Sequence, residues 1–281
     1  SIMTLTYQTA PKLLPLIVLK QVNLSLELGN SSVSAFAYVV FGFLLCGIVG
    51  DIDRGYQFGQ LALNMSENLS DLKIKAKVSQ TFNCYIRYWK DRLKASLDCL
   101  LDDYVLSLEI GDLEFASYAL YNYSYYAFCI GMSLEDVEHE ITKNIDVSCQ
   151  LNHQVVNYWN QILKQFVINL RETQKSHLTL TGEAYNEKDM LPVHRQAKDS
   201  VALLYVYFSK LQLCYLFQDF PQAVMNAELA ENYIESGIGQ PIIPIISMYN
   251  SLARLKVYAD VSSLQKQETL IQVRSNQDKM K

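Results

Sequence analysis

The side chains that most often catalyse reactions or bind metals are scattered along this chain of 281 residues. Its histidines form no HExxH motif and no pair four residues apart, the spacing of a helical zinc site; they are His139, His153, His177 and His194. Asp51, Asp53 and Gly55 resemble the start of a calcium loop, but Ala62 stands where the loop needs its glutamate. We therefore expect no catalytic residue, no metal site and no cofactor, and we expect Asp51 or Asp53 to cap a helix.

Motifs for nucleotide and kinase chemistry are also absent from the sequence. No GxxxxGK[ST] phosphate loop occurs, and the glycines of GIVGDIDRGYQFG lack both the GxGxxG spacing and a preceding strand. The HRD, DFG and VAIK motifs of protein kinases are missing. The net charge is -5 and no basic cluster stands out, so nucleic acid is not an expected partner. The sequence therefore predicts a segment that is not itself an enzyme.

The composition indicates a folded, helical protein of the cytoplasm. Half of the residues are hydrophobic and 19% are charged, with only 6 prolines and 11 glycines. The 6 cysteines lie far apart without a CxxC motif, which predicts buried, reduced thiols. The run 28–50 carries no charge, but Gly29–Ser32 interrupts it, so we expect a buried core helix and no membrane span. Because the chain begins with Ser1, we expect it to be a segment of a longer protein.

Small residues recur at helical spacing and predict the architecture. Gly55, Gly59 and Ala62 share one helix face at i, i+4 and i+7, and Ala223, Ala227 and Ala230 repeat this pattern. Ala95, Cys99 and Asp102 occupy the same three positions, as do Glu135, His139 and Thr142. Small residues on one face let another helix approach closely, as in tetratricopeptide hairpins. The spacing predicts an all-α fold: a right-handed, tetratricopeptide-like α-solenoid of antiparallel helix hairpins with a period of about 40–44 residues.

The same spacing divides the chain into hairpins. We expect one helical-repeat domain over residues 1–281, built from six segments. A first helix plus the opening hairpin covers 11–64, and hairpins follow at 75–104, 112–147, 154–192 and 200–235. A terminal helix pair covers 244–281.

Aromatic residues are the most suggestive candidates for binding. Tyrosines crowd the stretch 118–126, and tyrosine anchors many protein interfaces. First helices of stacked hairpins often line a concave face. We therefore expect a groove lined by Tyr85, Arg87, Trp89, Tyr121, Tyr125, Tyr158 and Tyr205. The alternative is ordinary packing between helices, with some rings left exposed.

Several runs of sequence carry a resemblance to known proteins. They are VNLSLELGNSSVSAFAYVVFGFLLCGIVGDIDRGYQFGQLAL, FNCYIRYWKDRLKASLDCLLDDY, LEIGDLEFASYALYNYSYYAFCIG, LTGEAYNEKDMLP and YNSLARLKVYAD. Together they resemble very long signalling proteins that are typical of cyanobacteria. Those proteins join a serine/threonine kinase, an AAA-type (STAND-like) ATPase, helical repeats, a GAF domain and a histidine kinase. The resemblance covers the helical repeats only and transfers no functional residue.

Three functional hypotheses follow from these observations. The first is a non-catalytic interaction and regulatory module that binds a peptide, a partner protein or neighbouring domains of its parent. The second is a structural spacer between the ATPase and the GAF and histidine kinase domains. The third is an enzyme or small-ligand receptor with an unfamiliar helical site, which would require a deep pocket with converging polar side chains.

Overall fold

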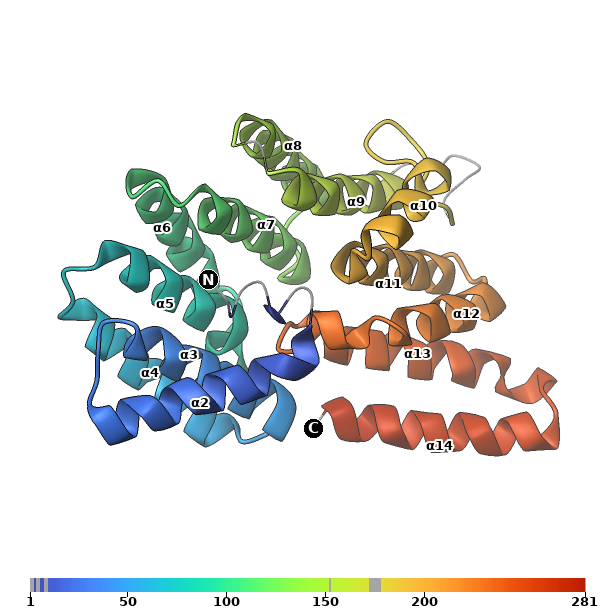
Figure 1. The fold of residues 1–281 in the computed structure, drawn as a ribbon. Coiled ribbons are helices and arrows are strands. Elements are labelled where there is room, and N and C mark those ends of the chain that lie inside the picture. Colours follow the sequence, from blue (N-terminus) through green and yellow to red (C-terminus); the bar gives the residue numbers. More distant parts are fainter. Residues whose placement is uncertain (1–2, 4–5, 8–9, 152, 172–177, 281) are drawn as a thin grey trace. The chain divides into compact units, whose positions relative to one another are not determined.

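The described part of the chain is all-α in a computed structural model, which describes residues 3, 6–7, 10–151, 153–171 and 178–280 (Figure 1). Those residues hold thirteen α-helices, α2 to α14, and no strand beyond one bridge between Thr181 and Asn186. The all-α prediction is confirmed. Contacts divide the chain into unit 1, Ser1–Asn157 with Ile238–Gln240, and unit 2, Tyr158–Gly237 with Pro241–Lys281. The single repeat domain over 1–281 stays a prediction.

Unit 1 is a series of helices joined by short connections. They are α2 (Leu14–Leu28), α3 (Ser34–Leu44), α4 (Ile52–Glu67), α5 (Leu72–Tyr85), α6 (Ala95–Glu109), α7 (Leu113–Cys129) and α8 (Leu134–Gln150), with short helices η1 (Pro11–Leu13), η2 (Leu45–Val49) and η3 (Arg87–Trp89). Each α-helix packs against the next, and α3 and α7 both pack against α5 (Figure 1). The charge-free run 28–50 forms α3 and η2, and almost all of α3 is buried.

Unit 2 follows the same order of packing. It contains most of α9 (Gln154–Arg171), then α10 (Glu187–Ala197), α11 (Ser200–Leu216), α12 (Phe220–Glu231), η4 (Ile234–Gly237), α13 (Ile242–Val257), η5 (Tyr258–Asp260) and α14 (Ser263–Met280). From α10 onward each helix packs against the next, and α11 also packs against α13. Alternate helices therefore touch in both units, as they do where hairpins stack.

Aspartates cap the start of five of these helices. The carboxylates of Asp51, Asp71, Asp112, Asp199 and Asp219 accept hydrogen bonds from backbone N–H groups in the first turn of α4, α5, α7, α11 and α12. The predicted cap at Asp51 is confirmed, with a bond of 3.0 Å from the amide of Arg54. Such caps satisfy amides that the helix leaves unpaired.

Glycines bring α3 and α4 into close contact. A Cβ on Gly42 would lie 2.6 Å from the carbonyl oxygen of Gly55, and one on Gly59 would lie 2.6 Å from the ring of Phe82. A Cβ on Gly55 would collide with the Cys46 sulfur. Ala62 is fully buried on the same face. In unit 2, Ala223, Ala227 and Ala230 are fully buried in α12, which packs against α11 and α13.

In α6 and α8 the buried residues lie one or two positions after the triplets that the sequence predicted. Ala95 is exposed, and Ser96, Leu100, Asp103 and Ser107 form the buried stripe of α6. The predicted triplet at 135, 139 and 142 likewise gives way to a stripe of Val137, Ile141, Asn144 and Ser148. Small size was the wrong guide here because the buried positions also hold leucine, isoleucine and asparagine.

The corrected stripes recur at a constant interval along the chain. Their last members in α4, α6 and α8 are Ser66, Ser107 and Ser148, which are evenly spaced in the sequence. We call the distance from one of these serines to the next the repeat interval. It falls within the range of about 40–44 residues that the small-residue triplets predicted.

Polar side chains join the two helices of a hairpin at the same register. The amide of Asn83 in α5 donates to the carboxylate of Asp103 in α6 over 2.8 Å. One repeat interval later, the amide of Asn144 in α8 donates to the hydroxyl of Ser124 in α7 over 2.6 Å. After a further repeat interval, the side chain of Gln165 in α9 accepts from the backbone amide of Tyr185, which precedes α10, over 3.3 Å. Because an unpaired buried polar group is costly, such pairs fix the register between helices.

We expect Gly59→Val to destabilise unit 1 by about 2 kcal/mol or more, because an added side chain must displace the ring of Phe82. Denaturant unfolding monitored through Trp89, in a Trp159→Phe background, measures this change. Gln60→Val is the matched control at the neighbouring exposed position. Equal stability of the two variants would contradict the close approach.

Candidate functional site

The tyrosine-rich helix α7 uses its predicted groove residues for internal packing. Tyr121 and Tyr125 are each 3% exposed, and their rings are nearly parallel with centroids 6.4 Å apart. The neighbouring Tyr126 is buried, and its hydroxyl donates to the carbonyl of Cys84 in α5. Tyr126 therefore joins α7 to α5, and the burial of Tyr121 and Tyr125 agrees with the alternative of ordinary helix packing.

Tyr85, Arg87 and Trp89 lie at the turn that joins α5 to α6, where all three are half-buried. The Tyr85 ring packs against Phe43 at 5.2 Å, and its carbonyl accepts from the Trp89 indole over 3.2 Å. The Arg87 guanidinium lies over the ring of Phe82 at 5.5 Å. Three of the seven predicted groove residues therefore meet at one turn.

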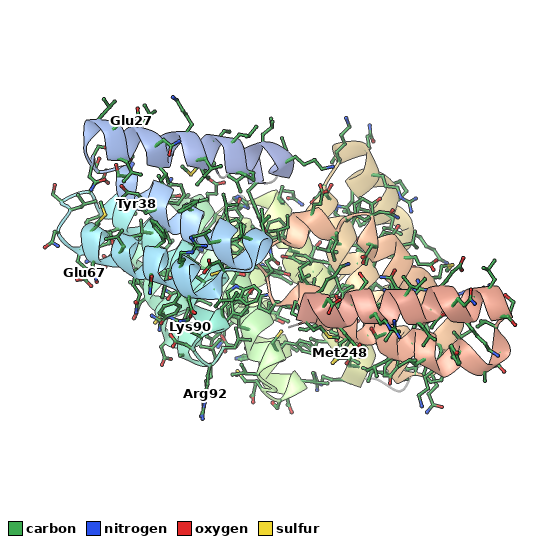
Figure 2. All side chains as sticks on the ribbon, turned by 90° about the horizontal axis from the view of Figure 1, so that it is seen from below. Glu27, Tyr38, Glu67, Lys90, Arg92 and Met248 are labelled. Carbon is green, nitrogen blue, oxygen red and sulfur yellow. The ribbon has the colours of Figure 1, made fainter. Side chains whose placement is uncertain are left out.

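Additional residues complete a mixed aromatic and basic surface at this turn. We call it the α5–α6 turn patch; it consists of Tyr56, Arg87, Tyr88, Trp89, Lys90, Arg92 and Lys94. The rings of Tyr88 and Trp89 stack with centroids 5.3 Å apart. Lys90 lies 5.6 Å above the Tyr56 ring, and the Tyr56 hydroxyl donates to Asp91 over 3.0 Å. Arg92 and Lys94 are exposed, and Figure 2 shows Arg92 pointing away from the ribbon.

This patch is ordered from within unit 1. The Tyr88 hydroxyl donates to the carbonyl of Gly239 over 2.7 Å, and burial raises the pKa of that phenol well above its usual value. Lys90 pairs with Asp53, whereas Arg92 and Lys94 extend into solvent. Aromatic rings held rigidly beside exposed cations favour binding of an acidic protein surface. The sequence indicated Arg87 and Trp89, but it did not indicate Tyr56 or the exposed cations.

Tyr158 and Tyr205 are the two predicted groove residues of unit 2. Tyr205 is 5% exposed and meets the Trp159 ring edge-to-face at 5.8 Å. Tyr158 is half-buried, with its ring 5.3 Å from the imidazole of His194. Tyr205 therefore belongs to the core of unit 2, and Tyr158 leads to a polar cluster.

That polar cluster was not predicted. His194 is 1% exposed, its Nδ1 lies 3.5 Å from the carboxylate of Asp199, and it stacks on the ring of Tyr185. Glu187 accepts from the amide of Leu180 and from the Lys210 ammonium, each over 2.8 Å. The Nε2 atom of His194 is buried and has no hydrogen-bond partner among the residues that the structure describes. The run NEKDMLPVHR supplies Glu187 and His194, but Asp199 and Lys210 lie outside it, so no single motif in the sequence indicated the cluster.

Asp103 is a carboxylic acid in an apolar setting. It is 3% exposed, and burial raises the pKa of its carboxyl to about 6, although hydrogen bonds from Ser79 and Asn83 oppose the shift. The charge of Asp102 raises this pKa further, and Arg87 lowers it.

Metal-binding and membrane-spanning features are absent from the part of the chain that the structure describes. No group of three His, Cys, Asp or Glu side chains there has the arrangement of a metal site. No helix in that part is both long and apolar enough to cross a membrane. All six cysteines are free; Cys46, Cys84 and Cys214 are buried, Cys99 and Cys129 half-buried, and Cys149 exposed.

Comparison with known proteins relates the chain to signal transduction. No protein-family model matches it. Over 185 residues, 65% of the chain, it is 30% identical to hybrid signal transduction histidine kinase G of Dictyostelium discoideum. The aligned part makes up 5% of that protein.

Asp103→Asn should stabilise unit 1 at pH 7 by about 1–3 kcal/mol, because it removes a buried charge and keeps an acceptor for Asn83. The folded state of the wild type holds the Asp103 proton up to about pH 6, whereas the unfolded chain loses it near pH 4. Wild-type stability therefore falls as the pH rises between these values, and the advantage of the variant disappears below about pH 4. Urea unfolding across this range tests both points, with the same substitution at the exposed Asp146 of α8, Asp146→Asn, as control.

Lys210→Met should destabilise unit 2 by about 2 kcal/mol, because Glu187 keeps a buried charge and loses its cationic partner. Unfolding followed through Trp159 in a Trp89→Phe background measures the loss. Lys188→Met removes an exposed lysine from α10 and should have little effect. A loss of equal size in both variants would argue against a specific Glu187–Lys210 pair.

Proposed function

We propose that this chain is a non-catalytic interaction and regulatory region of a long signalling kinase, located in the cytoplasm. The observation that carries the proposal is the recurrence of buried stripes and polar pairs at the constant repeat interval. Repeating hairpins offer extended surfaces for binding, and their interiors are occupied by packing instead of chemistry. The similarity to part of a hybrid signal transduction histidine kinase supports a signalling role.

We further propose that the helices form a right-handed, tetratricopeptide-like α-solenoid. Contacts between alternate helices in each unit support stacked hairpins. In the parent protein, such an array would stand beside the AAA-type, STAND-like ATPase, the serine/threonine kinase and the GAF and histidine kinase domains of the resembling proteins. A ligand of the array would change kinase output only if it bound the active and inhibited states with different affinities.

The α5–α6 turn patch is the proposed contact surface. Tyr121, Tyr125 and Tyr205 are buried, so binding is assigned to the half-exposed rings and exposed cations around Trp89. The partner is an acidic surface on a neighbouring domain or on a separate protein, because Arg92 and Lys94 carry positive charge into solvent.

A second candidate is a structural spacer. The burial of three predicted groove residues favours it, since those tyrosines stabilise the helices and are not presented to a ligand. A spacer needs a fixed length and tolerates changes on its surface. The two candidates therefore differ in their response to mutation of the turn patch.

Charge reversal at the patch separates the candidates. Arg92→Glu/Lys94→Glu in the full-length protein should reduce binding to the isolated acidic partner domain at least about tenfold and change histidine autophosphorylation. Lys73→Glu/Lys188→Glu makes the same change in net charge at exposed positions elsewhere and should change neither. Unaltered autophosphorylation in the patch variant, with altered output after deletion of one whole repeat, would favour the spacer.

A further inference from the structure

The helix α2 leaves a row of leucines uncovered. Leu16, Leu19 and Leu26 are 65%, 44% and 71% exposed, and we call them the α2 leucine face. The adjoining side of the helix, with Val18 and Val22, is buried, and α2 packs against α3. Three large apolar side chains on one outer helix face are a common mark of a protein interface.

The repeat register shows that neighbouring hairpins do not account for this face. α2 stands one repeat interval before α4, and Ser25, which bonds to the hydroxyl of Ser34 over 2.8 Å, corresponds to the buried Ser66. The leucine face then corresponds to Gln57, Gln60 and Glu67. These three residues are exposed although α4 is packed by both α3 and α5.

If helices packed around α2 as α3 and α5 pack around α4, the α2 leucine face would therefore still be exposed to water. Helix α6 shows the same exposure at Asp98, Leu101 and Leu108. What distinguishes α2 is that all three of its positions are leucine. A separate occupant is needed to remove them from solvent.

We propose that the α2 leucine face binds a second copy of this chain, with the two α2 helices antiparallel across a twofold axis. Successive helix residues rise about 1.5 Å, so this register places Leu19 of each copy opposite Leu26 of the other, with Asn23 close to the twofold axis. Both copies contribute the same residues, as an isologous interface requires.

The charges on α2 complement one another in this arrangement. Lys20 and Glu27 are both exposed, and the register brings Lys20 within one helical turn of Glu27 of the second copy. The same pair forms again on the other side of the axis. Figure 2 shows Glu27 on the side of α2 that faces away from α3 and α4, where a second helix can reach it. A parallel pair would instead place like charges together.

Sedimentation velocity of the 281-residue chain tests the proposal. The wild type should form dimers at micromolar concentration. Leu16→Gln/Leu19→Gln/Leu26→Glu, which gives α2 the residues that α4 carries at these positions, should raise the dimer dissociation constant roughly 100-fold or more. Circular dichroism, and the thermal midpoint at concentrations where the wild type is also monomeric, should stay as in the wild type, because all three side chains are exposed.

Charge variants test the antiparallel arrangement. Lys20→Glu should weaken the dimer by roughly tenfold, and Lys20→Glu/Glu27→Lys should restore it. Asn23→Cys, near the proposed axis, should form a disulfide-linked dimer under mild oxidation that the wild type does not form. Leu264→Gln/Ile271→Gln on α14 removes comparable exposed apolar area and should leave the dimer intact.

Several results would overturn the proposal. They are a wild type that remains monomeric up to about 100 μM, a dimer that survives the triple leucine variant, and a dimer lost only in the α14 variant. Failure of the charge rescue would reject the antiparallel register. None of these results bears on the α5–α6 turn patch, whose variants are assayed separately by binding and kinase output.

Discussion

The backbones of α3 and α4 meet at Gly42, Gly55 and Gly59, where no side chain separates the two helices. Close approach gives many atom contacts, but it leaves no room for adjustment, because a Cβ on any of these glycines overlaps an atom of a neighbour. Phe82 from α5 then rests on Gly59. The position of the third helix therefore depends on the contact between the first two.

In the later hairpins of unit 1, buried polar pairs join the two helices at the positions described above. Asn83 with Asp103 and Ser124 with Asn144 connect helices at equivalent positions, and each pair is buried. A hydrogen bond in a dry interface adds little net stability but excludes registers that would leave its groups unpaired. Asp103 shows the cost of this strategy, since a carboxyl serves where the following hairpin has the neutral Asn144.

The sequence predicted the helices better than it predicted their inward faces. Gly55 and Gly59 were recognised because glycine is unfavourable inside a helix, and two of them one turn apart on one face indicate close packing. Ala95 misled because Lys94, which precedes α6, makes no side-chain cap, so the sequence does not mark where that helix begins. An error of one residue rotates every side chain of a helix by about 100°. A related reason explains why some of the seven expected groove residues are buried and others are half-buried. Burial depends on neighbouring helices, and residue type alone contains no information about them.

The constant repeat interval has a consequence for how this protein can change length. The segment from Asp71 to Asp112 runs from one helix cap to the next equivalent cap, and it contains one stripe and one polar pair. Duplicating or deleting that whole segment would join a helix to a connection of the same geometry and recreate the same junctions. Gain or loss of any other number of residues would misalign the hairpins on one side. Genes encoding such chains can therefore vary in steps of one repeat while keeping every interface compatible.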